Sequence, residues 1–410
     1  MNKFKTFLLG IYDVYLREFK LVVHDLGIII FFAFLPLAYP VIYSLIYNPE
    51  LVKEVPFVVV DHDRTSGSRE LVRTLDACDE AWLLGYASDL NEARKAMDSH
   101  DVYAILEIPE GFSRDVENGE VGKTVLFTDM SLLLRYRGFL VATTGVMQAL
   151  GAEVQTRAID RVAPLAETIA VDNIMPINNV SLGDPQSGFA SFIMIGVLIL
   201  ILQQSLLLAM GMAGGARHEK ASVVGYNPHN NARYVPATMI GQSLCYLSII
   251  VLPGIWLIHY VPMIFEFPMQ GVLWQELLFL VPFLIAVLGM GFVIQALVTE
   301  REAIFLVWVV TTLFFLFLCG MIWPRYALPP FWKAVSDAIP VSWAIEGFIR
   351  MNSNGAQLWQ VSHEYIMLWI NAAGWGIAGY VMQRWVMLPS VIKLIKKGKS
   401  QQQVSIAEKN

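Results

Sequence analysis

The stretch GEVGKT, residues 119–124, carries the residue types that could bind a phosphate group. Its Gly-Lys-Thr ending is that of a phosphate-binding loop, but a Walker A motif also needs a glycine at position 117, where the chain has Glu117. Such a loop follows a strand and begins a helix. Here the predicted order is reversed, with a short helix before the motif and a strand after it. We therefore interpret GEVGKT as a helix-to-strand turn and predict no nucleotide site.

The sequence DHD, residues 61–63, offers two carboxylates and an imidazole to a metal ion. Neighbouring residues of a strand point to opposite faces, so these three side chains do not converge easily, and we expect a solvated strand end. The other histidines lack the spacing of metal ligands. No serine or cysteine lies in a GxSxG-like context. We predict no catalytic residue, no metal site and no cofactor bound by this chain.

The third stretch is GGARHEKASVVGYN, residues 214–227, which lies between two segments long and apolar enough to span a membrane. One interpretation is a solvated loop, which has to be polar. The other is an element that docks onto a partner. The candidate docking residues are Arg217, His218, Glu219, Lys220, Gly225 and Tyr226.

The composition of the chain is that of a membrane protein with a soluble part. Of 410 residues, 56% are hydrophobic and 16% are charged, and the mean hydropathy is +0.52. Soluble proteins carry about 25% charged residues. No basic face or basic-aromatic stripe occurs, which excludes a nucleic-acid partner. Of the three cysteines, Cys245 and Cys319 lie in apolar runs, so Cys78 has no partner for a disulfide in the soluble part.

Six segments have the roughly 20 apolar residues that a membrane span needs. They are 26–47, 187–212, 235–261, 272–298, 303–323 and 364–388. Lys and Arg are concentrated before the first span, after the second, and in the tail 391–410, whereas the turn 259–271 has none. Cytoplasmic loops carry the excess of basic residues, so we expect both termini in the cytoplasm and the insert 48–186 outside.

Two further elements follow from periodicity. Residues 1–25 repeat apolar side chains at helical spacing, with Asp13, Arg17, Lys20 and His24 on the opposite face, which predicts an amphipathic interfacial helix rather than an extension of the first span. The insert 48–186 alternates strand-like and helical segments and ends in a long helix. This order predicts an α/β domain with a mixed sheet.

Polar residues inside predicted spans are costly and call for an explanation. Gln203 and Gln204 lie in the middle of the second span, and Gln295 lies near the inner end of the fourth. One interpretation is hydrogen bonding between helices. The other is that these residues line a transport path.

The segment 324–353 is unusual for a connecting loop because prolines divide it into short amphipathic pieces. We expect re-entrant elements in the outer leaflet that act as a gate or a packing element, in preference to a plain connector. The candidate gate residues are Pro324, Pro329, Pro340 and Glu346.

Taken together, these segments resemble an ABC-2 type transporter permease with a large extracytoplasmic domain between spans one and two. The resemblance covers the whole chain. Its motifs are the interfacial "elbow" helix, VVDHDRT and IPEGFSRDVENGE in the insert, the RHEK segment, and a spaced pattern of Gly320, Pro324, Pro329, Pro340, Glu346 and Gly355.

The resemblance implies a half-transporter that pairs with a second permease, identical or paralogous, and with separate ABC subunits that bind ATP and Mg. It also implies that 213–234 is a cytoplasmic coupling loop within the membrane region 187–390, and that this loop forms a coupling helix. The family's loop typically contains R-E followed by Gly-Thr. Arg217 and Glu219 match, but Ala221 and Ser222 replace the Gly-Thr pair.

We therefore expect an ATP-driven exporter of an amphiphilic, drug-like or lipid-like molecule in a bacterial inner membrane. The insert would lie in the periplasm, where an adaptor protein and an outer-membrane channel are possible partners, and membrane lipids would surround the spans. The alternative is a non-transporting membrane receptor or mechanotransmitter whose external domain binds a ligand or a partner.

Overall fold

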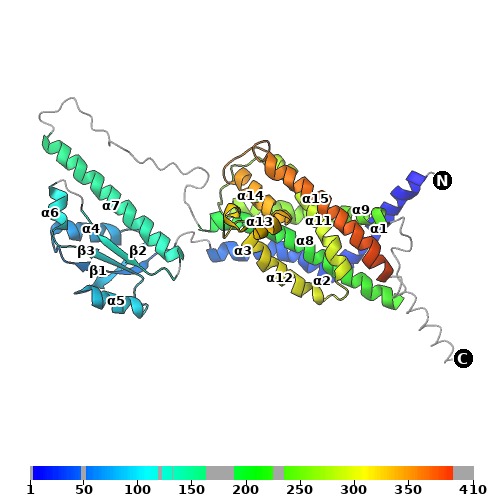
Figure 1. Cartoon of the computed structure of the whole chain (residues 1–410), viewed down its shortest axis with the longest axis horizontal. Helices are drawn as coiled ribbons and strands as arrows, with labels where there is room; N and C mark the ends of the chain where they lie inside the picture. Colours follow the sequence, from blue (N-terminus) through cyan, green and yellow to red (C-terminus); the bar gives the residue numbers. More distant parts are fainter. Residues whose placement is uncertain are drawn as a thin grey trace. The chain divides into compact units, whose positions relative to one another are not determined.

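A computed structural model describes residues 3–47, 52–118, 122–131, 133–162, 189–224 and 235–390. The chain divides into two compact units. Met1–Asn48 and Ser181–Asn410 form a helical unit, and Pro49–Val180 form an α/β unit (Figure 1).

The α/β unit contains a four-stranded mixed sheet, as the sequence predicts. Its strands are β1 (Val55–Asp61), β2 (Ala81–Tyr86), β3 (Ala104–Ile108) and β4 (Val125–Thr128), in the order β2-β1-β3-β4. β1 is parallel to β2 and β3, whereas β4 is antiparallel to β3. The central strand β1 is apolar over most of its length because helices cover both of its faces.

Helices cover the two faces of this sheet (Figure 1). α4 (Ser66–Asp76) and α7 (Leu133–Val162) pack on one face, against alternate β1 residues that include Phe57 and Val59. α5 (Leu90–Asp98) packs on the other face, against Val58 and Val60. Side chains cap two of these helices, because Thr65 accepts from the backbone N–H of Ser68 in α4 and Asp89 accepts from that of Glu92 in α5. α6 (Phe112–Glu117) precedes β4.

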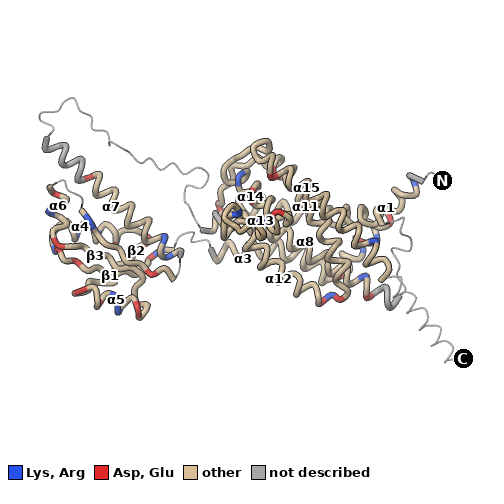
Figure 2. Tube along the Cα trace, in the orientation of Figure 1, with Lys and Arg blue, Asp and Glu red and all other residues tan. Residues whose placement is uncertain are grey.

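The helical unit is built from long apolar helices joined by shorter elements. They are α1 (Lys3–His24), α2 (Leu26–Ile29), η1 (Ile30–Phe34), α3 (Leu35–Tyr47), α8 (Phe189–Val224), α9 (Val235–Ile255), η4 (Trp256–Tyr260), α10 (Val261–Ile264), α11 (Leu273–Leu297), α12 (Ala303–Leu318), η5 (Arg325–Ala327), α13 (Pro330–Asp337), α14 (Pro340–Asn352), α15 (Ser362–Met382) and η6 (Gln383–Met387). The middle of this unit is almost free of charged residues (Figure 2).

Within the described residues, five helices are long and apolar enough to cross a membrane. They are Leu26–Ile46, Ile193–Glu219, Val235–Ile264, Leu273–Leu297 and Ser362–Ser390. The sixth segment expected to span, 303–323, contains α12, an apolar helix of 16 residues. A count of six spans therefore stays a prediction.

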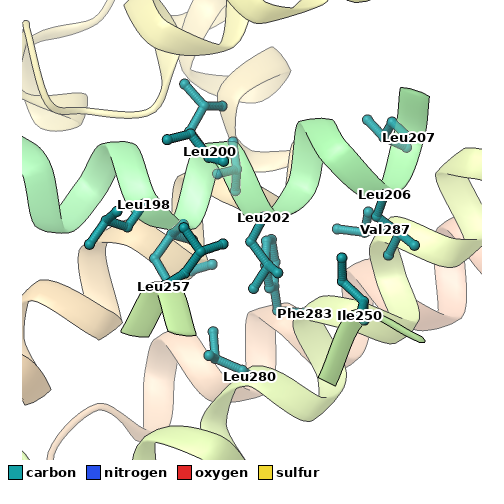
Figure 3. Packing of buried hydrophobic residues seen from close by; sticks show 14 of the residues in the cluster. Leu198, Leu200, Leu202, Leu206, Leu207, Ile250, Leu257, Leu280, Phe283 and Val287 are labelled. Atoms are coloured by element: carbon teal, nitrogen blue, oxygen red, sulfur yellow. The ribbon is translucent and has the colours of Figure 1, made fainter. Parts of the chain in front are cut away.

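α8 forms the centre of the helical unit. Of its most apolar stretch, 89% is buried, more than in any of the other four helices of spanning length among the described residues. Leu198, Leu202 and Leu206 of α8 belong to one apolar cluster with side chains of α9, η4 and α11 (Figure 3). Apolar packing on every side explains why α8 has no polar face along this stretch.

Candidate functional site

The RHEK segment is helical, as the resemblance implies, but it continues the long helix α8 and is not a separate short helix. α8 continues without a break to Val224, so the loop expected from residue 213 is helical over its first twelve positions. The glycine pair permits close packing against other parts of the chain. A Cβ on Gly214 would lie 3.2 Å from Cγ of Gln295, and one on Gly215 would lie 2.9 Å from the backbone nitrogen of Arg301.

Arg217 and His218 are buried inside the chain, with 2% and 4% of their surfaces exposed. This corrects the expectation that they form an exposed docking surface. Glu219 is half exposed. Lys220 lies in α8, and Gly225 and Tyr226 lie outside the described residues. The role of this segment in docking a partner stays a prediction.

Arg217 reaches a buried acid on the elbow helix. Its Nη1 donates a hydrogen bond to Oε1 of Glu18, which is 3% exposed, and the hydroxyl of Tyr246 donates to the same oxygen. Gln242 donates from Nε2 to Oε2 of Glu18 at 3.4 Å, and Gln295 donates from Nε2 to the Tyr246 hydroxyl at 3.4 Å. These five residues, here called the elbow cluster, come from α1, α8, α9 and α11.

A second arginine lies in the turn between α11 and α12 and joins two more acids. Arg301 pairs with Asp25, in the turn after α1, at 2.8 Å and with Glu219 of α8 at 2.8 Å. The two arginines thus join α1, α8 and the α11–α12 turn through charges, at the same end of the helical unit. We call this the elbow end.

The elbow helix α1 has three faces. One packs along α9 and carries Glu18, Leu21 and Val22, which are buried. A second exposes large apolar side chains, and a third exposes the charged pair Asp13–Arg17 at 2.8 Å. The two exposed faces fit an amphipathic helix at a membrane surface. The exposed apolar residues are Leu8, Leu9, Tyr12, Leu16, Phe19 and Val23.

The three glutamines proposed to line a path do not form one site. Gln295 belongs to the elbow cluster. Gln203 and Gln204 lie roughly ten residues earlier along α8 than the Gly214 that contacts Gln295, a rise of about 15 Å. Both are buried, and neither has a hydrogen-bond partner among the described residues. The hydrogen-bonding interpretation therefore holds for Gln295 and not for Gln203 or Gln204.

The segment after α12 is a folded unit organised by Arg325. This side chain is 9% exposed, donates hydrogen bonds to Asp337 and Glu346, and stacks on the Trp343 ring at 3.7 Å. Gly320 has a φ of +94°, and a Cβ there would lie 3.0 Å from Cγ of Arg325.

The prolines in this segment begin its helices. Pro324 precedes η5, Pro329 precedes α13, and Pro340 is the first residue of α14, positions that need no backbone N–H donor. The expected short, proline-bounded helices are confirmed. Their role as a gate stays a prediction.

The acids of DHD are hydrogen-bond acceptors within the turn after β1. Asp63 accepts from the Thr65 hydroxyl, from the Ser113 hydroxyl and backbone N–H, and from the Gly111 N–H. Burial favours the neutral acid, but these hydrogen bonds outweigh it and keep the pKa of Asp63 below its usual value. Asp61 accepts from Ser68 and from two backbone N–H groups of the same turn.

The described residues contain no group of three or more side chains that could hold a metal ion. Residues 119–121 of GEVGKT are not described, but α6 ends at Glu117 before the motif and β4 begins at Val125 after it. A helix before the motif and a strand after it are therefore as predicted, and this order is the reverse of a phosphate-binding loop.

The profile of the ABC-2 family transporter protein matches residues 26–381. The chain belongs to the ABC-2 transporter family. A search of curated proteins found no match. The matched range includes the α/β unit and the first four helices of spanning length. It ends one residue before the end of α15, so the family match extends over both units.

ABC-2 permeases are typically the non-catalytic membrane components of ABC transporters, which in general take a separate ATP-binding subunit. The residues that sequence analysis missed in this ABC-2 protein are Glu18, Gln242, Tyr246, Asp25 and Arg301. One signal was available, because Glu18 lies off the polar stripe of Asp13, Arg17, Lys20 and His24, where an apolar residue is expected.

Proposed function

We propose that the chain is the permease subunit of an ATP-driven exporter, which moves an amphiphilic, drug-like or lipid-like molecule outward. The observation that carries this proposal is the family match over residues 26–381, across both units of the chain. The cargo class is supported by an interior of apolar helices with few ionised groups.

The ATP-binding subunit, which would hold ATP and Mg, docks at the elbow end. Two features support this placement. Basic residues gather in the flanks at this end, which favours the cytoplasm. The segment 213–234 also begins here, and Glu219 is exposed enough to touch a partner. Because Arg217 and His218 are buried, direct contact falls to Glu219 and the residues after it.

Gln203 and Gln204 are the residues that we propose to form hydrogen bonds with the cargo along its path. A buried amide without a hydrogen-bond partner is costly, so such a side chain is expected to serve a ligand or water. The tryptophan N–H of Trp308 in α12 is likewise buried and without a partner among the described residues. All three groups are neutral, which favours an uncharged hydroxyl or amide on the cargo over an ionised group.

The assembly that we propose has two permeases, each with six spans, in a bacterial inner membrane. α12 would be the fifth span, and it exposes apolar side chains around a groove of about 500 Å³ that a second permease or membrane lipid would cover. The α/β unit would lie in the periplasm, where it could meet an adaptor protein linked to an outer-membrane channel.

Co-purification tests this function. The permease is expressed with candidate ABC ATP-binding proteins from the same genome, and the purified complex is assayed for Mg-ATP hydrolysis. We expect a stable complex, and we expect Glu219→Ala to weaken it while Asp13→Asn, on the exposed pair of α1, leaves it intact. A permease that binds no ATP-binding subunit would contradict the proposal and favour a membrane receptor or mechanotransmitter.

A further inference from the structure

We propose that Glu18 is a positioning residue that makes the elbow helix α1 move with the ATPase-facing end of α8. The inference rests on the proposed function, because it assumes that an ATP-binding subunit moves that end of α8. It adds a route for the movement. Force passes from α8 to α1 through the buried pair Arg217–Glu18, and from α1 into the first span.

The pair is built to resist separation. Arg217 and Glu18 are 2% and 3% exposed, so drawing them apart without admitting water would leave two uncompensated charges in an apolar interior. Tyr246 and Gln242 of α9 hydrogen-bond to the same carboxylate and fix its direction. A movement of α8 that keeps this pair intact must carry α1 along.

Two further contacts lie on the same face of α1 as Glu18. Gly241 of α9 lies so close to α1 that a Cβ there would be 2.7 Å from the carbonyl oxygen of Ile11. At the other end of α1, Arg301 joins Asp25 to Glu219. The remaining two faces of α1 are exposed, so within the described residues it is the Glu18 face that joins α1 to the other helices.

Apolar side chains in place of Arg217 and Glu18 would fix the position of α1 relative to α8 less strictly. Hydrophobic contact is non-directional, so an apolar surface can slide, whereas an ion pair with additional hydrogen bonds fixes one arrangement. Replacing a buried ion pair with apolar residues often leaves stability unchanged, whereas removing one partner is strongly destabilising. A double substitution therefore separates a positioning role from a purely structural one.

The experiment uses the permease in complex with its ATP-binding subunit. Spin labels are placed at Tyr12→Cys on α1 and at Trp369→Cys on α15, both exposed positions, in a chain whose native cysteines are replaced by alanine. Pulsed electron paramagnetic resonance measures the distance between the labels without nucleotide and with Mg-ATP and vanadate. The test variant is Glu18→Gln with Arg217→Met, which removes both charges and leaves the Tyr246 hydroxyl an acceptor.

The matched control is Asp13→Asn with Arg17→Met, which removes the exposed ion pair of the same helix. We expect the parent and the control to show a nucleotide-dependent change in distance. In the test variant we expect this change to be lost, while the melting temperature and ATP hydrolysis are retained. Glu18→Gln by itself is expected to lower the melting temperature.

Two results would overturn the inference. In one, the test variant keeps the full distance change, which makes the pair structural only. In the other, the parent complex hydrolyses ATP without any movement of α1. A third result is a permease that binds no ATP-binding subunit. It would contradict the proposed function, and the inference would fail because it rests on that function.

Discussion

At the scale of single residues, the buried polar groups of this protein join motifs that are distant in the sequence. Asp63 is the example in the α/β unit, because its carboxylate connects the turn after β1 to Gly111 and Ser113 at the start of α6. The two sequence motifs VVDHDRT and IPEGFSRDVENGE thus meet at one carboxylate. Asp61 and Asp63 therefore hold the turn after β1 and the start of α6 in place.

Asp63→Asn is expected to destabilise the α/β unit at neutral pH by about 1 kcal/mol, because an amide accepts fewer of these hydrogen bonds and the site is only partly buried. The pKa of Asp63 is lowered in the folded state. Its contribution is therefore present above the unfolded pKa of about 3.9 and disappears as the pH falls through the folded pKa. Thermal unfolding of the two proteins between pH 7 and pH 3 measures the difference. It should shrink toward the acid end, and Asp98→Asn on an exposed carboxylate of α5 should show none.

Arg325 joins separate parts of the segment after α12, as Asp63 does in the α/β unit. Arg325→Lys keeps the positive charge but cannot bridge Asp337 and Glu346 while stacking on Trp343, so we expect a loss of roughly 1–3 kcal/mol. Tryptophan fluorescence during thermal unfolding in detergent measures it. Arg350→Lys is the control, because Arg350 pairs with Glu364 but is half exposed. Equal losses of stability in the two variants would show that the ion pairs of Arg325 contribute no more than those of a half-exposed arginine.

At the scale of elements, close helix packing decides features that composition leaves open. Gly214 and Gly215 suggest a loop when only local sequence is considered, because glycine is a poor helix former. They lie inside α8 instead, at positions where α11 and the α11–α12 turn approach too closely for a side chain. The partner of a glycine lies elsewhere in the chain, so the sequence cannot distinguish these cases. The strands and helices of the insert were predictable because their periodicity is local.

The contact between α11 and α15 provides a prediction of the same kind. A Cβ on Gly289 would lie 2.6 Å from the carbonyl carbon of Trp375, so the two backbones touch. Gly289→Val must separate α11 from α15, and overpacking of this kind costs about 1–3 kcal/mol. Gly376→Val is the matched control on α15, because nothing lies within 4 Å of its added Cβ. Melting temperatures in detergent compare the two variants, and a stable Gly289→Val protein would contradict the close approach.

At the scale of the whole molecule, the sequence predicts the two units and most of the membrane helices but not the elbow cluster. Units and spans follow from composition over tens of residues, which a single sequence displays. The elbow cluster joins residues 18, 217, 242, 246 and 295, whose proximity depends on how four helices pack. The acid that pairs with Arg217 is Glu18, 199 positions away in the sequence, which no local pattern indicates.

The orientation of the chain in the membrane is the remaining large-scale prediction. Basic residues flank the elbow end, so α1 should face the cytoplasm and the α/β unit the opposite side. In a chain with Cys78→Ser, a membrane-impermeant maleimide is applied to intact spheroplasts. It should label Asn91→Cys on the exposed surface of α5, and it should label Lys20→Cys on α1 only after lysis. The remaining cysteines, Cys245 and Cys319, are buried and provide the unreactive background. Labelling of Lys20→Cys before lysis would invert the topology and remove the elbow end from the side where ATP is available.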